Sequence, residues 1–180
     1  MEPRLSHADA ALDPCILPLS DADIPDLIQL ARTIWYAHYP SIITVEQIEY
    51  MLDQRYRPEI IRRQLASGTA WWDKLLVDGA MVAFASYELS EHAGAMKLDK
   101  LYVRYDLRGQ GYGRLLIGHV EAKARAQGKT RLYLQVNKNN ATAIAAYLRN
   151  GFVVTESARF DIGCGFIMDD FVMSKTLPAA

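Results

Sequence analysis

The chain has 180 residues, of which 51% are hydrophobic and 23% are charged, and its formal net charge is −1. This is the composition of an ordinary globular domain, and it lacks the basic excess typical of nucleic-acid binding. No apolar run reaches the ~18–20 residues of a membrane span, and residues 1–13 lack the features of a secretory signal. Two cysteines, Cys15 and Cys164, suit a cytoplasmic protein and are expected to be buried. We therefore expect neither a nucleic-acid partner nor a membrane partner.

The first half of the chain predicts helices followed by a small sheet. Residues 1–13 are polar and aperiodic, which predicts a flexible tail, and residues 14–176 are expected to form one domain. A short strand over residues 15–19 comes first. Helical spacing and capping residues then predict three helices, over residues 20–39, 44–53 and 58–67. An antiparallel meander follows, with strands over residues 69–77, 81–89 and 95–103.

The second half alternates helices with strands. Apolar spacing of three and four residues predicts a helix over residues 112–124, which Gly128 ends. The remaining elements are a strand, a short helix and two closing strands, over residues 130–137, 140–148, 152–157 and 166–175. No internal repeat or linker divides the chain, so we expect a single α/β or α+β domain.

A glycine-rich turn, Arg108-Gly109-Gln110-Gly111-Tyr112-Gly113-Arg114, joins the third strand of the meander to the next helix. Glycine permits positive φ and close backbone approach, and the helix N-terminus presents free N–H groups that bind phosphate. The third glycine of a dinucleotide fingerprint would fall at Arg114, and Lys123 stands where a P-loop has its first glycine. The alternative is a turn that only begins a helix.

A second motif follows the strand that ends at Asn137. Asn140 and Tyr147 are seven residues apart, so two helical turns place them on the same helix face. Gly151 and Phe152 come directly after this helix. Taken alone, Asn140 could act only as a helix cap and Tyr147 only in packing.

Together, in this order and spacing, the two motifs resemble those of the GNAT superfamily of acetyl-CoA-dependent N-acetyltransferases. The first family signature matches Arg108, Gly111 and Gly113; the second matches Asn140, Ala143, Tyr147, Gly151 and Phe152. The resemblance covers about residues 14–176. It implies a mixed, mostly antiparallel sheet of about seven strands, with helices on both faces and a splay between the fourth and fifth strands.

The resemblance also implies acetyl-CoA as the cofactor and places its parts. The turn would bind the pyrophosphate of coenzyme A through Arg108, Gly109, Gln110, Gly111, Tyr112, Gly113 and Arg114. The fourth strand would hold the pantetheine arm through Leu101, Tyr102 and Val103. The channel would be lined by Asn137, Asn140, Ala143 and Tyr147. Tyr147 would protonate the departing thiolate, and the N–H of Val103 would stabilise the oxyanion.

An alkylammonium acceptor must lose a proton before it can attack a thioester. Asp99, on the strand beside the cofactor, is the first candidate base, and Glu88 on the preceding strand is the second. The alternatives are that both are surface charges of the sheet, or that a chain of water molecules removes the proton.

The acceptor pocket implied by the family is covered by the first helices, where this chain carries Trp35, Tyr36 and Tyr39. Aromatic rings suit a cationic amine. The acidic residues of the second helix, Glu46, Glu49 and Asp53, have the spacing of a solvated face. No histidine cluster has metal-ligand spacing, so no metal is expected.

The sequence therefore predicts an N-acetyltransferase that moves an acetyl group from acetyl-CoA to a primary amine by direct attack in a ternary complex. The acceptor is either a small molecule, such as a polyamine, or a peptide or protein amine. A non-catalytic acyl-CoA sensor is the alternative, and a nucleotide-binding module is a third reading. The sequence is compatible with a homodimer.

Overall fold

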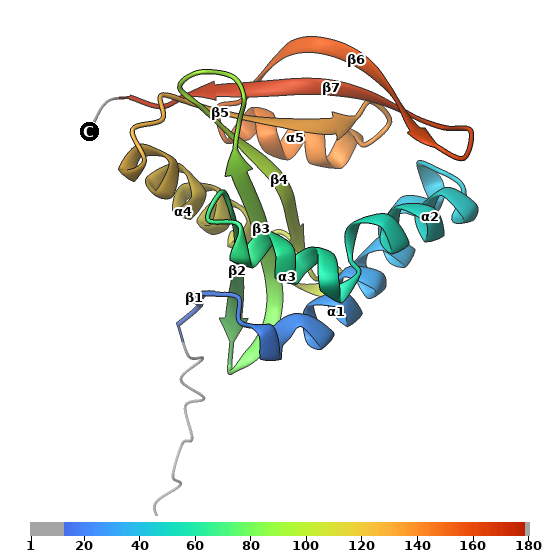
Figure 1. The fold of residues 1–180 in the computed structure, drawn as a ribbon, viewed down its shortest axis with the longest axis horizontal. Helices are drawn as coiled ribbons and strands as arrows, with labels where there is room; N and C mark the ends of the chain where they lie inside the picture. The colour runs from blue at the N-terminus through green and yellow to red at the C-terminus, as the bar shows by residue number, and fades with distance from the viewer. Residues whose placement is uncertain (1–12, 179–180) are drawn as a thin grey trace, which may run out of the picture.

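The computed structural model describes residues 13–178, so the predicted tail, except for residue 13, lies outside the described residues (Figure 1). Seven strands form one sheet in the order β1-β2-β3-β4-β5-β7-β6. Their bounds are β1 Cys15–Pro18, β2 Ala70–Val77, β3 Ala80–Leu89, β4 Ala95–Val103, β5 Arg131–Asn137, β6 Val153–Gly163 and β7 Phe166–Thr176. Every neighbouring pair is antiparallel except β4 and β5, which are parallel. The predicted mixed, mostly antiparallel sheet is confirmed.

Helices cover both faces of this sheet. Their bounds are α1 Ile24–His38, α2 Val45–Arg55, α3 Pro58–Ala66, α4 Tyr112–Ala126 and α5 Ala141–Arg149, with short 3₁₀ turns at Asp21–Asp23, Tyr39–Ser41 and Tyr105–Leu107. Because side chains alternate along a strand, Trp72 and Phe84 pack against α1, α2 and α3, whereas Leu75 and Ala83 pack on the face of α4 and α5. Two apolar cores result, one on each face.

Local signals in the sequence explain where the helices begin and end. The Thr44 side chain accepts a hydrogen bond from the Gln47 N–H at 3.2 Å, and Asn140 accepts one from Ala143 at the same distance. Each bond satisfies an N–H that has no partner within its helix. Gly128 follows α4 with a φ of +68°, which glycine adopts readily. Asn140 therefore caps α5 as predicted, and Thr44 caps α2.

The sheet opens between β4 and β5. Backbone pairing joins only Ala95–Lys97 of β4 to Arg131–Tyr133 of β5. The later parts of the two strands therefore separate. On its other edge β4 carries a bulge, because Ser86 pairs with Lys100 while Tyr87 pairs with Leu98, which leaves Asp99 as the extra residue. Bulges redirect side chains and increase local twist. The predicted splay is thus present, and Asp99 lies beside it.

The last hairpin reaches further than the sequence indicates. β6 extends to Gly163 rather than to residue 157, because its backbone pairs with β7 as far as Phe166. The Tyr50 hydroxyl of α2 donates to the Ile162 carbonyl at 2.6 Å, and the Tyr50 ring lies 5.4 Å from that of Phe166. The hairpin tip therefore lies against α2, as Figure 1 shows.

Two smaller findings complete the fold. The expectation that the cysteines are buried is wrong: Cys15 lies on the edge strand β1, Cys164 lies in the β6–β7 turn, and both are exposed and unpaired. Edge strands and turns leave side chains in solvent, whatever their intrinsic preference for the core. Within residues 13–178, no helix has both the length and the apolar character needed to cross a membrane.

Candidate active site

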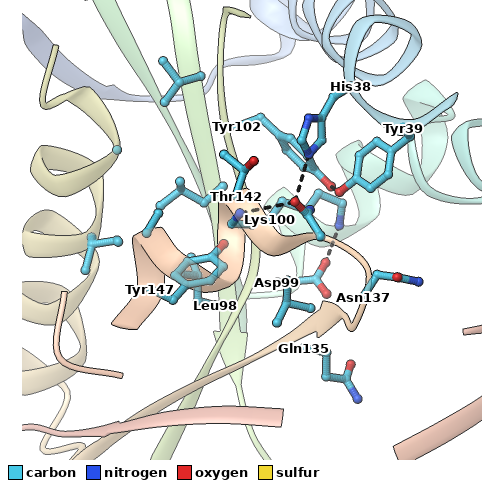
Figure 2. A pocket seen from close by; sticks show the side chains of 18 of the residues that line it. His38, Tyr39, Leu98, Asp99, Lys100, Tyr102, Gln135, Asn137, Thr142 and Tyr147 are labelled. Atoms are coloured by element: carbon cyan, nitrogen blue, oxygen red, sulfur yellow. Dashed lines mark hydrogen bonds and ion pairs between the residues drawn. The ribbon is translucent and has the colours of Figure 1, made fainter. Parts of the chain in front are cut away.

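A cavity of about 310 Å³ occupies the opening between β4 and β5 (Figure 2). Most of its lining divides into two groups. The donor half comprises Leu98, Leu101–Val103, Leu107–Gly109, Tyr112–Arg114, Asn140, Ala143 and Tyr147. The acceptor half comprises Trp35, Tyr39, Met51, Arg55, Lys97, Asp99, Asn137, Met168 and Asp170. His38 lies where the two halves meet.

The glycine turn forms one end of the donor half. Gly109 and Gly111 have φ values of +80° and +90°, and Gly111 is the N-cap of α4 without a side-chain cap. The first N–H groups of α4 therefore have neither an intrahelical acceptor nor a capping oxygen, and they carry the positive end of the helix dipole. Arg108 and Arg114 flank this helix start in the cavity wall. Such an arrangement binds a phosphate or pyrophosphate.

The β4 edge of the gap offers free backbone groups. The Arg104 N–H donates to the Val82 carbonyl of β3 at 2.9 Å. Because successive N–H groups point to opposite edges of a strand, those of Leu101 and Val103 point into the gap. A Cβ atom placed on Gly113 would lie 3.9 Å from the side chains of Leu101 and Val103, so α4 begins in close contact with this part of β4. An extended amide chain can pair here as an added strand.

Tyr147 projects from α5 into the donor half, as Figure 2 shows. Its ring packs edge-on against Phe152 at 5.6 Å. Burial raises the pKa of Tyr147, and nearby Tyr39 adds to the effect, so its phenol is protonated at neutral pH. The side chain can therefore donate a proton inside the cavity.

His38, at the end of α1, connects residues from three distant segments. Arg108 Nη1 lies 3.2 Å from His38 Nδ1, and His38 Nε2 lies 3.1 Å from Asn140 Oδ1. A guanidinium only donates, so Nδ1 accepts and Nε2 carries the hydrogen that is donated to Asn140. Burial and the Arg108 charge lower the pKa of His38, which keeps this neutral form. Sequence reasoning did not predict either of these contacts of His38, because its two partners lie 70 and 102 residues away along the chain.

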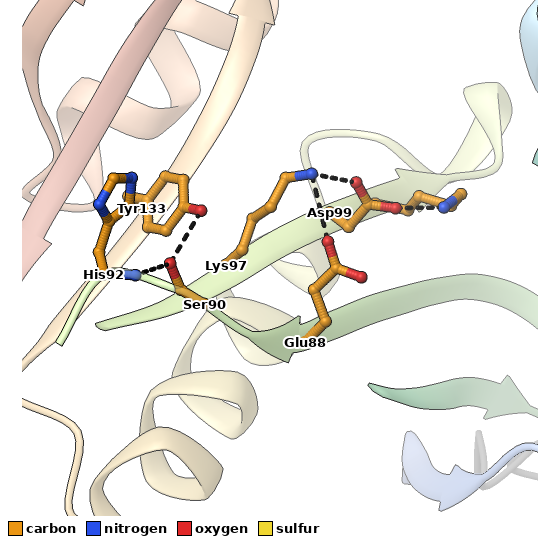
Figure 3. A network of polar contacts seen from close by, with 7 residues as sticks. Glu88, Ser90, His92, Lys97, Asp99 and Tyr133 are labelled. Atoms are coloured by element: carbon orange, nitrogen blue, oxygen red, sulfur yellow. Dashed lines mark hydrogen bonds and ion pairs between the residues drawn. The ribbon is translucent and has the colours of Figure 1, made fainter. Parts of the chain in front are cut away.

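The two candidate bases belong to one charged network (Figure 3). Lys97 Nζ lies 3.0 Å from Asp99 and 3.3 Å from Glu88, and Lys100 forms a second ion pair with Asp99. Burial alone would raise the pKa of Asp99, but the two lysines more than offset this and hold it well below its usual range. Asp99 lines the cavity. Glu88 lies outside the cavity wall and is linked to the cavity by its ion pair with Lys97.

Asp170, on β7, is a carboxylate of the acceptor half that sequence reasoning missed. It is 4% exposed, and its Oδ1 atom has no hydrogen-bond partner among the described residues. Burial raises its pKa to about 6. Its sequence, Asp169-Asp170 within an apolar strand, resembles an ordinary surface pair, so no local signal marks it as buried.

The aromatic residues predicted to bind the acceptor separate into two groups. Trp35 and Tyr39 line the cavity, and the Tyr39 and Tyr102 hydroxyls lie 3.3 Å apart. Tyr36 stands outside the lining, and its hydroxyl donates to Glu49. Among the predicted cofactor residues, Gln110 and Gly111 also lie outside the lining, although Gly111 shapes the turn through its backbone. Asn137, also predicted to line the cofactor channel, lines the cavity in the acceptor half, where its backbone pairs with Asp170.

Comparisons with known proteins identify the family. The model of the acetyltransferase (GNAT) family matches residues 25–152. Spermidine N(1)-acetyltransferase of Thermoplasma acidophilum is 27% identical over 158 residues, which are 86% of this chain and 94% of that protein. PaiA N-acetyltransferase of the same organism, solved with coenzyme A, has a TM-score of 0.79 at 24% identity, covering 92% of this chain and 99% of that chain. The ribosomal-protein-S18-alanine N-acetyltransferase of Escherichia coli has a TM-score of 0.69 at 21% identity, covering 93% and 96%.

The donor half also fits coenzyme A on its own geometry. The uncapped α4 start suits the pyrophosphate, and the free edge of β4 suits the amides of the pantetheine arm. Tyr147 lies in the same wall and holds a transferable proton. On the fold, the donor half and the family match, this chain belongs to the acetyltransferase (GNAT) family, as an N-acetyltransferase that uses acetyl-CoA.

Proposed function

We propose that the protein acetylates the primary amine of a small cationic molecule of the polyamine type, by direct attack on acetyl-CoA within one cavity. The observation that carries this proposal is the continuity of the cavity from the glycine turn to the buried carboxylate of Asp170. Both substrates can then be bound together, and no covalent enzyme intermediate is needed. The similarity to a spermidine acetyltransferase over most of both chains supports the same class of acceptor.

The residues of the donor half have distinct roles in this reaction. The Val103 N–H, which points into the gap, stabilises the oxyanion that forms when the amine adds to the thioester carbonyl. Tyr147 donates its phenolic proton to the departing thiolate. Asn140, fixed by His38 and by the Ala143 N–H, lines the channel beside them.

The acceptor half offers aromatic rings and a buried carboxylate to an alkylammonium group. The Trp35 and Tyr39 rings pack at a tilt with their centroids 4.6 Å apart, and the Tyr102 ring lies 5.9 Å from that of Trp35. Aromatic faces attract ammonium groups, and the adjacent carboxylate supplies a countercharge. Met51 and Met168 add adaptable apolar surface for a carbon chain.

A thiol-release assay with acetyl-CoA tests this proposal against polyamines, amino acids, aminoglycosides and peptides with free N-termini. We expect release with polyamines, matched one to one by acetylated amine in the mass spectrum. Faster thiol release with peptides would show that a peptide amine, rather than a small molecule, is the preferred acceptor. Coenzyme A binding without release for any acceptor would contradict an enzyme and favour the acyl-CoA sensor.

A further inference from the structure

Asp170 lies on the face of the sheet that borders the acceptor half. It pairs with Asn137 of β5 and Ala158 of β6 through the backbone. Met168, two residues earlier on β7, packs with the core under α1, α2 and α3, while Phe171 packs with the opposite core. Because side chains alternate along a strand, Asp170 faces the same side as Met168.

The Asp170 carboxylate is buried in the cavity wall. The residue is 4% exposed and lines the cavity, and no described residue forms a hydrogen bond with its Oδ1 atom. Buried polar groups in proteins are nearly always hydrogen-bonded, because loss of water without compensation is costly. A buried carboxylate oxygen left unpaired in a cavity therefore indicates a hydrogen-bond donor that arrives with a ligand.

The surrounding charges do not neutralise Asp170. Arg55 of α2 and Lys138 after β5 lower its pKa, while the adjacent Asp169 raises it. Lys138 forms its own ion pair with Asp169, and Tyr39 contributes no charge because its pKa is raised by burial. Burial outweighs these effects and leaves the pKa at about 6.

Asp99 differs from Asp170 in its pairing. Two lysines bind Asp99, so it stays ionised and is a weak proton acceptor. Asp170 is ionised at neutral pH and still basic enough to take a proton from a bound ammonium group. Of these two carboxylates in the cavity wall, Asp170 is the better suited to serve as the base.

We infer that Asp170 binds the ammonium group of the acceptor and removes its proton, as a catalytic residue of the acceptor half. This inference rests on the proposed function. One N–H bond breaks and the proton passes to Asp170 and then to solvent. The freed lone pair forms the N–C bond, the C–S bond breaks, and Tyr147 protonates the thiolate. The second proton lost by the nitrogen restores the Tyr147 phenol, so the products are the amide, the free thiol and one released proton.

Asp170→Asn tests the inference, because it keeps the side-chain shape and removes the charge. We expect kcat/KM for a polyamine to fall about 100-fold, while the Kd of acetyl-CoA changes less than twofold. The wild-type profile of log kcat/KM against pH should decline below about pH 6, and the variant should lack this limb. Glu156→Gln, which neutralises an exposed carboxylate on the neighbouring strand β6, is the matched control and should change kcat/KM less than threefold.

A second acceptor separates proton removal from mere support of the fold. 2,2,2-Trifluoroethylamine is largely neutral at pH 7.5, so the loss in Asp170→Asn should shrink to about tenfold or less with this amine. An equal loss with both amines, or an unchanged kcat/KM, would overturn the inference. If the variant does not fold, the absence of the acidic limb in wild-type enzyme would overturn it as well. Wild-type enzyme that is inactive with every amine contradicts the proposed function itself, and this inference falls with it.

Discussion

The two halves of the cavity are built from very different parts of the chain. The donor half comes mainly from two continuous segments, residues 101–114 and 140–147, each a strand end or turn that leads into a helix. The acceptor half gathers side chains from α1, α2, β4, β5 and β7. The donor half is thus encoded locally, whereas the acceptor half exists only once the sheet has formed. Variants in each half should therefore affect different substrates.

Tyr147→Phe should have the largest effect. Removal of the phenolic proton leaves the thiolate to depart unprotonated, so kcat should fall about 100-fold or more. Calorimetric titration should show a Kd for acetyl-CoA within twofold of wild type, because the ring and its contact with Phe152 remain. Tyr133→Phe, which alters a hydroxyl that pairs with Ser90 outside the cavity, is the control. An undiminished kcat would remove Tyr147 from the mechanism.

Asp170→Asn should stabilise the protein while it impairs catalysis. The pKa of Asp170 is raised to about 6 in the folded state, so the folded state binds the proton more tightly than the unfolded state does. Above pH 6 the buried charge lowers the free energy of unfolding, and this loss is recovered as pH falls from 6 to 4. The variant should therefore be about 2 kcal/mol more stable than wild type at pH 8, and the difference should vanish near pH 4. Urea titrations at both pH values measure this, and a constant difference would contradict it.

Gly111→Ala should weaken binding of the donor alone. Gly111 has a φ of +90°, which strains an alanine by about 1–3 kcal/mol and displaces the N–H groups at the start of α4. We expect the Kd of acetyl-CoA to rise about tenfold and KM for the amine to stay unchanged. Gly118→Ala is the matched control, since Gly118 is helical, has no positive φ, and has open space around an added Cβ. An equal rise in both variants would show that the turn conformation is not what binds the donor.

His38→Ala should have the smallest effect, and it should weaken the binding of both substrates. The substitution removes one contact of Arg108 and one contact of Asn140, so we expect about threefold increases in both the Kd of acetyl-CoA and KM for the amine. The exposed His92 provides the control substitution, His92→Ala. An effect on only one substrate would show that His38 belongs to one half rather than to their junction.

The same division explains what the sequence could predict. Apolar periodicity and the caps at Thr44 and Asn140 predicted the helices of both faces, and the two motifs predicted the splayed sheet. The extension of β6 and the exposure of Cys164 were not predictable, because backbone pairing across the hairpin decides them.

The acceptor half was harder to predict for a physical reason. Asp99 could be proposed from its place on β4, but the bulge and the two lysines that set its acidity depend on pairing across the sheet. Asp170 lies 71 residues further along the chain and faces the cavity only because β7 pairs with β5. Long-range register, rather than local pattern, places these groups.

Bisubstrate initial-rate kinetics on the wild-type enzyme test the central claim most directly, namely that both substrates occupy one cavity and react without a covalent enzyme intermediate. Double-reciprocal plots against acetyl-CoA, at several fixed polyamine concentrations, should give intersecting lines. Labelled coenzyme A should not exchange into acetyl-CoA when the amine is absent. Parallel lines together with rapid exchange would show an acetylated enzyme and would contradict the account.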